Sequence, residues 1–309
     1  MGTILYTHSD CFGHDPGRMH PEHPARLKSI LNALSADEFS SLDRREAPKA
    51  TVEQIARAHP QDYVESILAA VPESGERHLD GDTVMTPGTG DAILRGSGAV
   101  CAAVDAVLGG AAKNAFCAMR PPGHHAEPRT PMGFCFFNQI AVGADHARAA
   151  HGLRRVAIVD FDVHHGNGTQ AIFEADGGVF YASTHQTPLF PGTGKANERG
   201  VGNIVNVPLP PMAGSEEFRA AISEIISPKL IEFHPELLMI SAGFDAHIDD
   251  PLASLCLTEE DFAWVTEELM RVADLVCDGK IVSVLEGGYD LEALAQSTAA
   301  HVRTLMKAS

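Results

Sequence analysis

The feature that most constrains the fold of this chain is a series of short apolar runs that alternate with helical patterns. Seven runs are candidate strands, at residues 3–6, 115–119, 156–161, 179–183, 204–207, 237–241 and 281–285. Several are apolar almost throughout, which is typical of strands that are covered on both faces. Strands that alternate with helices predict an α/β fold in which a central, mainly parallel β-sheet is flanked by helices on both sides.

The segments between these runs have helical periodicity. One apolar helix face begins just after Pro24 and consists of Leu27, Ile30, Leu31 and Leu34. Another follows Thr258 and Asp261, which resemble a capping box, and consists of Phe262, Val265, Leu269, Val272 and Val276. No linker, repeat or low-complexity segment interrupts the chain, so we expect residues 1–309 to form a single domain.

Composition excludes several classes of protein. Hydrophobic residues make up 44% of the chain and charged residues 21%, which argues against disorder and against a coiled coil. The net charge of −18 argues against nucleic-acid binding through a basic surface, although it suits solubility and a cationic partner. No apolar run reaches the length of about 18 residues that a membrane span needs. With no signal-peptide pattern and no CxxC pair, we expect a cytoplasmic protein with free thiols.

Polar side chains follow four candidate strands at the point where each strand ends. They are His124 and His125 after 115–119, Asp162 and His164 after 156–161, Asp245 after 237–241, and Tyr289 after 281–285. Ligands of open parallel sheets bind beyond the carboxyl ends of the strands. We therefore expect these side chains to share one site.

Asp162 and His164 form a candidate metal-binding pair. They are two residues apart in extended chain, so both side chains leave on the same side. A carboxylate oxygen and an imidazole nitrogen suit Zn²⁺, with Fe²⁺ or Co²⁺ as alternatives. A catalytic zinc ion takes about three protein ligands, and Asp245 is the candidate for the third. An ordinary pair of loop residues is the competing interpretation.

His124, His125 and Tyr289 are candidates for proton transfer. A stiff Pro-Pro-Gly turn precedes the two histidines, and imidazole exchanges protons near neutrality because its ordinary pKa is about 6.5. Tyr289 follows two glycines that allow its loop to approach a ligand. Structural roles remain open for all three residues when each is considered alone.

Six motifs in fixed succession together resemble the zinc-dependent histone deacetylase family. They are Arg-Pro-Pro-Gly-His-His-Ala at 120–126, Gly-Phe-Cys-Phe-Phe-Asn at 133–138, Asp-Phe-Asp-Val-His-His-Gly-Asn-Gly-Thr at 160–169, Phe-Pro-Gly-Thr-Gly at 190–194, Ala-Gly-Phe-Asp-Ala at 242–246 and Glu-Gly-Gly-Tyr at 286–289. Asn167 is similar to class II members and their bacterial relatives, the histone deacetylase-like amidohydrolases. The resemblance implies the arginase–deacetylase fold.

The resemblance also implies roles for individual residues in catalysis. Asp162, His164 and Asp245 would bind Zn²⁺. His124 and His125 would be tandem catalytic histidines, with Asp160 behind His124 and Asn167 near His125. Tyr289 would hydrogen-bond the carbonyl of the substrate.

Other residues would bind substrate or potassium. Gly133, Phe134 and Phe190 would wall a narrow tunnel for an acyl-lysine stem, Asp82 would hold the substrate backbone, and Arg26 would line an internal channel. One K⁺ site would be formed by Asp160, Asp162, His164, Ser183 and Thr184, largely through backbone oxygens. A second K⁺ site would be formed by Phe173, Asp176, Val179 and Asn203.

The implied activity is hydrolysis of an acetyl or longer acyl group from the ε-amine of lysine, with release of acetate in the first case. An acetylpolyamine or another small acetylated amine is the alternative substrate to an acetyl-lysine peptide or protein. Leu252 lies where a polyamine-specific relative carries glutamate, which favours acyl-lysine. The retained histidines and tyrosine argue against a binding-only module, and His165 with Asn167 argues against a dimetal ureohydrolase. The physiological substrate, the acyl chain, the metal used in vivo and the oligomeric state, a homo-oligomer included, stay open.

Overall fold

An eight-stranded sheet, all of whose paired strands are parallel, runs through the computed structural model, which describes residues 2–308. Its strands are β1 (Thr3–Thr7), β2 (Asp43–Glu46), β5 (Asn114–Cys117), β6 (Val156–Asp160), β7 (Val179–Gln186), β8 (Ile204–Leu209), β9 (Leu237–Ala242) and β10 (Ile281–Leu285). Their order in space is β2-β1-β5-β10-β9-β6-β7-β8. The prediction of a mainly parallel sheet is confirmed.

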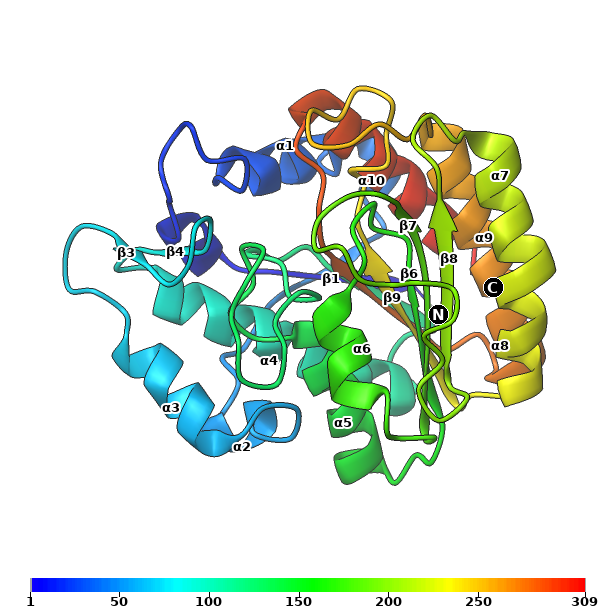
Figure 1. Cartoon of the computed structure of the whole chain (residues 1–309), viewed down its shortest axis with the longest axis horizontal. Coiled ribbons are helices and arrows are strands. Elements are labelled where there is room, and N and C mark those ends of the chain that lie inside the picture. Colours follow the sequence, from blue (N-terminus) through cyan, green and yellow to red (C-terminus); the bar gives the residue numbers. More distant parts are fainter. Residues whose placement is uncertain (1, 309) are drawn as a thin grey trace.

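Helices cover both faces of this sheet. The α-helices among residues 2–308 are α1 (Ala25–Ala33), α2 (Val52–Ile55), α3 (Gln61–Ala69), α4 (Thr89–Leu108), α5 (Gln139–His151), α6 (Asn167–Phe173), α7 (Ser215–Ala220), α8 (Ser227–Phe233), α9 (Glu259–Val276) and α10 (Leu291–Leu305). Figure 1 shows α4, α5 and α6 on one side of the sheet and α8, α9 and α10 on the other.

Short elements complete the fold. The 3₁₀ helices η1 (Ser9–Gly13) and η2 (Asp37–Phe39) lie in the N-terminal part, and the π-helical segment η3 (Ala221–Ile226) joins α7 to α8. The strands β3 (Arg77–His78) and β4 (Val84–Met85) form a separate antiparallel pair. Among residues 2–308, no helix combines the length and the apolar character that crossing a bilayer requires.

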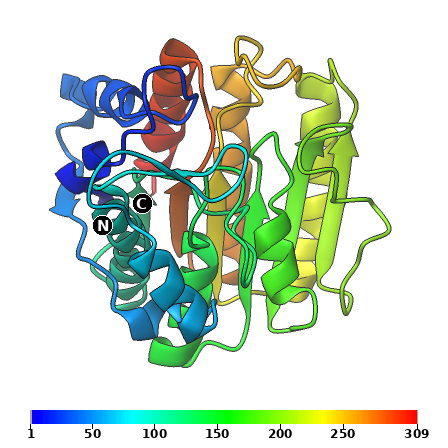
Figure 2. The same cartoon turned by 60° about the vertical axis from the view of Figure 1, so that its left-hand side comes forward.

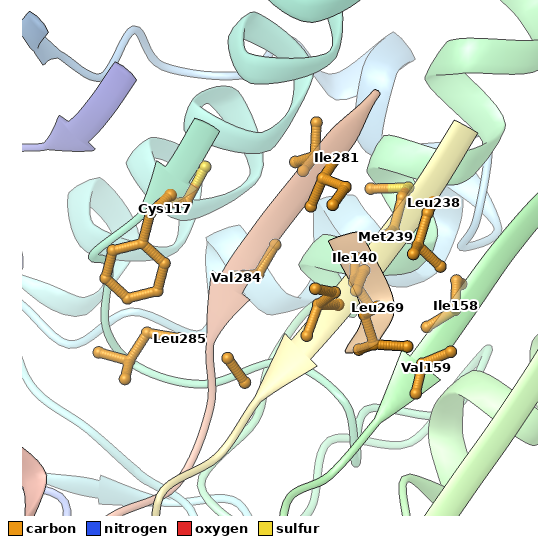
Figure 3. Packing of buried hydrophobic residues seen from close by; sticks show 14 of the residues in the cluster. Cys117, Ile140, Ile158, Val159, Leu238, Met239, Leu269, Ile281, Val284 and Leu285 are labelled. Atoms are coloured by element: carbon orange, nitrogen blue, oxygen red, sulfur yellow. The ribbon is translucent and has the colours of Figure 1, made fainter. Parts of the chain in front are cut away.

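The core lies between the sheet and its two helical layers. Side chains of the adjacent strands β10, β9 and β6 meet Ile140 of α5 and Leu269 of α9, and all of them are buried (Figure 3). The apolar spacing predicted for α9 is confirmed, because Phe262, Val265, Leu269 and Val272 are buried and Val276, which is partly buried, packs against the core. At its start, the carboxylate of Asp261 accepts a hydrogen bond from the backbone N–H of Thr258 at 3.1 Å.

Most predicted strands match to within two residues at either end, and two strands differ more. The strand β2 has the sequence Asp-Arg-Arg-Glu and is mostly exposed, so it carries no apolar signal; its pairing with β1 at the edge of the sheet defines it. The strand β7 extends three residues beyond the predicted end, to Gln186. These added residues are polar but buried, and they are hydrogen-bonded, as when the N–H of Gln186 donates to the oxygen of Val163 at 2.8 Å.

The strand order places the candidate site at the middle of the sheet. The strands β5, β10, β9 and β6 are direct neighbours, and the turned view in Figure 2 shows the strands side by side. All four candidate segments therefore leave the sheet at the same edge. The sequence predicted the four strand ends, and the structure adds that the four strands are adjacent.

Candidate active site

Asp162, His164 and Asp245 come together at the ends of β6 and β9. One ligand atom from each lies within 4.8 Å of the others, and all three residues are buried. The Nδ1 atom of His164 is 3.1 Å from Asp162 Oδ1 and 3.1 Å from Asp245 Oδ2. The chain thus concentrates two carboxylates and one imidazole at a single point.

Two glycines make room for this cluster. A Cβ atom on Gly287 would overlap the carboxylate of Asp245 and approach that of Asp162, and one on Gly243 would overlap Asp162. Glycine also lets backbone N–H groups come close. The N–H of Gly287 donates to Asp162 Oδ2 at 2.8 Å, and that of Val163 donates to Asp245 Oδ1 at 2.9 Å.

The cluster fits a divalent metal ion. Burial and repulsion by the negative charge of Asp162 raise the pKa of Asp245 to about 7. Burial opposes the charged form of His164, but its hydrogen bonds to Asp162 and Asp245 raise its pKa to about 10. The site therefore favours positive charge, and its oxygen and nitrogen donors are those that Zn²⁺ binds.

His124 is held by a buried carboxylate. Its Nδ1 donates to Asp160 Oδ2 at 3.0 Å, and the hydroxyl of Tyr181 donates to the same oxygen at 3.0 Å. Burial opposes charging of the ring, but the charges of Asp160 and Asp162 raise the pKa of His124 well above its ordinary value. His124 is therefore held as a cation.

His125, in contrast to His124, is held as a neutral ring. Asn167 Oδ1 lies 2.8 Å from His125 Nδ1, and the amide nitrogen of Asn167 donates to Glu127 at 2.9 Å. The amide orientation requires His125 Nδ1 to be the donor, so Nε2 carries the lone pair of the neutral ring. Burial and the neighbouring His124 and His164 hold the pKa of His125 well below its ordinary value.

Sequence reasoning assigned no role to Glu286, although it belongs to one of the six motifs. Its Oε2 accepts hydrogen bonds from the backbone N–H groups of Gly123 at 2.8 Å and His124 at 3.1 Å. Burial raises the pKa of this carboxyl to about 7. Glu286 thus fixes the turn before the two histidines, and its position at a strand end was the available signal.

A buried arginine supports the loop that carries Tyr289. Arg26 Nε donates to the oxygen of Gly288 at 2.6 Å, and Nη2 donates to the oxygen of Glu286 at 2.5 Å. Its guanidinium carbon lies 4.8 Å from the centre of the Tyr289 ring, and Glu22 balances its charge at 3.1 Å. Burial raises the pKa of the Tyr289 phenol well above its ordinary value, so the hydroxyl keeps its proton.

The predicted tunnel residues lie beside the two histidines and Tyr289. The ring of Phe190 is 5.0 Å from that of His125, and the ring of Phe134 is 5.9 Å from that of Tyr289. A Cβ atom on Gly133, whose φ is +56°, would lie 2.5 Å from the His125 ring and 3.0 Å from that of Phe190. Phe190 is 41% exposed, so it forms the outer part of this group.

Asp82 and Leu252 connect to the same region through their neighbours. The side chain of Asp82 accepts a hydrogen bond from the Thr83 hydroxyl at 3.2 Å, and that hydroxyl accepts one from the N–H of Phe134 at 3.3 Å. The buried carboxylate of Asp250 accepts from the N–H of Leu252 at 2.9 Å and from the N–H of Tyr289 at 2.8 Å. Hydrogen bonds thus link Asp82 to Phe134 through Thr83, and Leu252 to Tyr289 through Asp250.

The residues predicted for the first potassium site lie together on β6, β7 and the segment after β6. Asp160 and Ser183 are paired in the sheet register. Thr184 Oγ1 is buried and, among residues 2–308, has no hydrogen-bond partner. A buried hydroxyl oxygen without a partner in the described chain, one residue after the strand neighbour of Asp160, is available to a cation.

The residues predicted for the second potassium site also meet, around the side-chain amide of Asn203. The backbone oxygens of Phe173, Asp176 and Val179 all accept from Asn203 Nδ2, at 2.8, 3.0 and 2.7 Å. The Oδ1 atom of the same amide accepts from the N–H of Val201 at 3.2 Å, which fixes its orientation. Three carbonyl oxygens thus converge near one amide nitrogen, which carries two hydrogens, and a K⁺ ion at this second site stays a prediction.

The fold is an α/β fold with a buried group of metal-ligating residues at the carboxyl ends of its strands, and comparison with known proteins assigns it to a family. The family model described as "Histone deacetylase domain" matches residues 20–305. The chain belongs to the histone deacetylase family.

Individual relatives span nearly the whole chain. Histone deacetylase 14, chloroplastic, from Arabidopsis thaliana is 40% identical, over 98% of this chain and 76% of that protein. A histone deacetylase-like amidohydrolase from Pseudomonas aeruginosa is 41% identical, over 87% of this chain and 71% of that protein. The crystal structure of the HDA15 HD domain superposes with a TM-score of 0.94 at 33% identity, over 100% of this chain and 89% of that one. This similarity agrees with the arginase–deacetylase fold.

We predict that Gly287→Ala disrupts the cluster without unfolding the protein. The added methyl group overlaps the carboxylate of Asp245, so the retention of a bound Zn²⁺ ion and the rate of deacetylation should fall together. Metal content after dialysis, turnover and thermal unfolding check this. Gly177→Ala is the control, because a Cβ atom there meets nothing closer than 3.9 Å. If Gly287→Ala behaves like Gly177→Ala, the close approach at Gly287 is not required.

Proposed function

We propose that this protein is a zinc-dependent deacetylase that hydrolyses the amide bond of acetylated lysine side chains and releases acetate. One observation carries the proposal: the buried cluster of Asp162, His164 and Asp245 lies beside a neutral histidine, His125, whose ring is 5.8 Å from that of His164. A metal-ligating set next to a proton acceptor is the arrangement that metal-assisted hydrolysis requires.

The metal would be held by Asp162, His164 and Asp245. Zn²⁺ bound there would polarise the substrate carbonyl and make water more acidic near neutrality. K⁺ is the cation that we propose for the first of the two predicted sites, near Asp160, Ser183 and Thr184. Backbone N–H groups keep both carboxylates in place, so the ligands are preorganised before any ion arrives.

The protein's own groups would move the protons. His125 Nε2 accepts a proton from the attacking water, because the other nitrogen of this ring already donates to Asn167. The resulting imidazolium then gives that proton to the leaving amine. The cationic His124 and the hydroxyl of Tyr289 stabilise the negative charge that develops on the carbonyl oxygen.

Acetyl-lysine in a peptide or protein is the substrate class that we propose. Phe134 and Phe190 would contact the apolar stem of the lysine side chain, and Asp82 would accept a hydrogen bond from its backbone N–H. Leu252 offers no charge to a second ammonium group, as an acetylpolyamine would require. The net charge of −18 suits lysine-rich segments in general.

We predict that Tyr289→Phe lowers kcat by about 10²–10³, the usual value of one oxyanion donor. The phenylalanine ring occupies the same space beside Phe134, so zinc content and KM should stay close to native. Steady-state kinetics with an acetyl-lysine peptide and metal analysis of the same sample check this. A native rate in the Tyr289→Phe enzyme would show that the hydroxyl takes no part in the reaction.

We predict that the native enzyme prefers an acetyl-lysine peptide to an N-acetylated polyamine, and that Leu252→Glu shifts the preference towards the polyamine. The new carboxylate would pair with the distal ammonium, an interaction worth roughly 1–3 kcal/mol before solvent screening. The ratio of kcat/KM for the two substrates measures the shift. Leu252→Gln is the uncharged control and should leave the ratio near native. A native preference for the polyamine would contradict the proposed substrate class.

A further inference from the structure

A second group of metal-ligating side chains lies away from the active site, between two helices. It consists of Asp105 on α4 and of His146 and His151 on α5. One ligand atom of each lies within 4.8 Å of the others. The active-site cluster, in contrast, comes from the segments after β6 and β9.

The two histidines converge on one oxygen. His146 Nε2 is 2.8 Å from Asp105 Oδ1, and His151 Nε2 is 2.7 Å from the same atom. The side chain of His146 is only 6% exposed, whereas those of His151 and Asp105 are 26% and 53% exposed. The group is therefore anchored on its inner side by His146 and open to solvent on its outer side.

We propose that Asp105, His146 and His151 form a second metal site, which takes a divalent ion of the zinc, nickel or copper type. Two imidazole nitrogens and one carboxylate oxygen are the donors that such ions prefer, and water would complete the coordination on the open side. An ion at this point replaces two hydrogen bonds with metal–ligand bonds. On each histidine the ring proton moves from Nε2 to Nδ1, so the protein loses no proton.

Arg57 opposes this exchange of protons and therefore lowers the affinity of the site for the ion. Its Nη1 atom lies 2.6 Å from His146 Nδ1. A guanidinium only donates, so this contact keeps the proton of His146 on Nε2, where the metal would bind. Metal binding therefore requires Arg57 to release His146. Glu53 is the alternative partner, because its carboxylate is 3.9 Å from Arg57 and is 87% exposed.

Binding at this site would connect the C-terminal parts of α4 and α5. Asn138, the residue before α5, caps that helix and contacts the oxygen of His124 at 3.4 Å. An ion that binds only the folded protein raises its stability. The site would thus stabilise the helical layer behind the catalytic histidines without contacting the substrate.

The proposal is tested by equilibrium dialysis, which measures how many zinc ions each protein binds across the micromolar range of free Zn²⁺. Native protein should bind two equivalents, and His151→Ala should bind one and keep native deacetylase activity. Asp245→Ala should lose the active-site equivalent and keep the second. His78→Ala is the matched control, since this histidine is exposed and its one described acidic neighbour is 3.9 Å away; it should bind two equivalents.

Arg57→Gln gives a test in the opposite direction. The glutamine oxygen can accept the Nδ1 proton of metal-bound His146. The second equivalent should therefore bind about tenfold more tightly, which is the usual size of the effect of such supporting contacts.

A spectroscopic test uses Cu²⁺ as the probe. In the electron paramagnetic resonance spectrum, the nitrogen hyperfine splitting from the second site should weaken in His151→Ala.

The proposal is overturned if native protein never binds a second equivalent, if His151→Ala still binds two, or if Arg57→Gln fails to tighten binding. These results are separable from a failure of the proposed function. That failure would appear as an inactive native enzyme, or as an active Asp245→Ala enzyme, with the second equivalent unchanged.

Discussion

The arrangement of the site depends on one constraint, the burial of four carboxylates at the ends of three neighbouring strands. Asp160 is the last residue of β6 and Asp162 follows it, Asp245 follows β9, and Glu286 follows β10; all four are fully buried. A buried carboxylate without partners is strongly destabilising, so the surrounding chain must supply positive charge and hydrogen-bond donors. Most features of the site are consequences of this requirement.

The donors come from three sources. Backbone N–H groups at Gly123, His124 and Gly287 approach the carboxylates closely. The imidazole of His124 donates to Asp160, and two hydroxyl groups also donate, that of Tyr181 to Asp160 and that of Ser241 to Glu286. Asp162 and Asp245 also accept backbone hydrogen bonds, but one oxygen of each still lies 3.1 Å from the same atom, His164 Nδ1. A divalent cation is the partner that this remaining negative charge favours.

Sequence patterns predicted the parallel sheet and the main site residues because buried strands are apolar and because the polar side chains of the candidate site follow them directly. The strand order was not predictable, since apolar runs do not specify their neighbours. The strand β2 was missed because its charged sequence gives no strand signal. Asn203 was predicted among potassium ligands, but only coordinates show its amide nitrogen among the three carbonyl oxygens. The group at Asp105 was missed because its members lie on two helices and look like ordinary polar surface.

The central claim is that one metal ion between Asp162, His164 and Asp245 makes this enzyme active. The most direct measurement compares native protein with Asp245→Ala for zinc content and for hydrolysis of an acetyl-lysine peptide in the same preparations. The account predicts that the variant loses one equivalent of zinc and nearly all turnover together, while its circular dichroism stays native. An Asp245→Ala protein that hydrolyses the peptide at the native rate would contradict it.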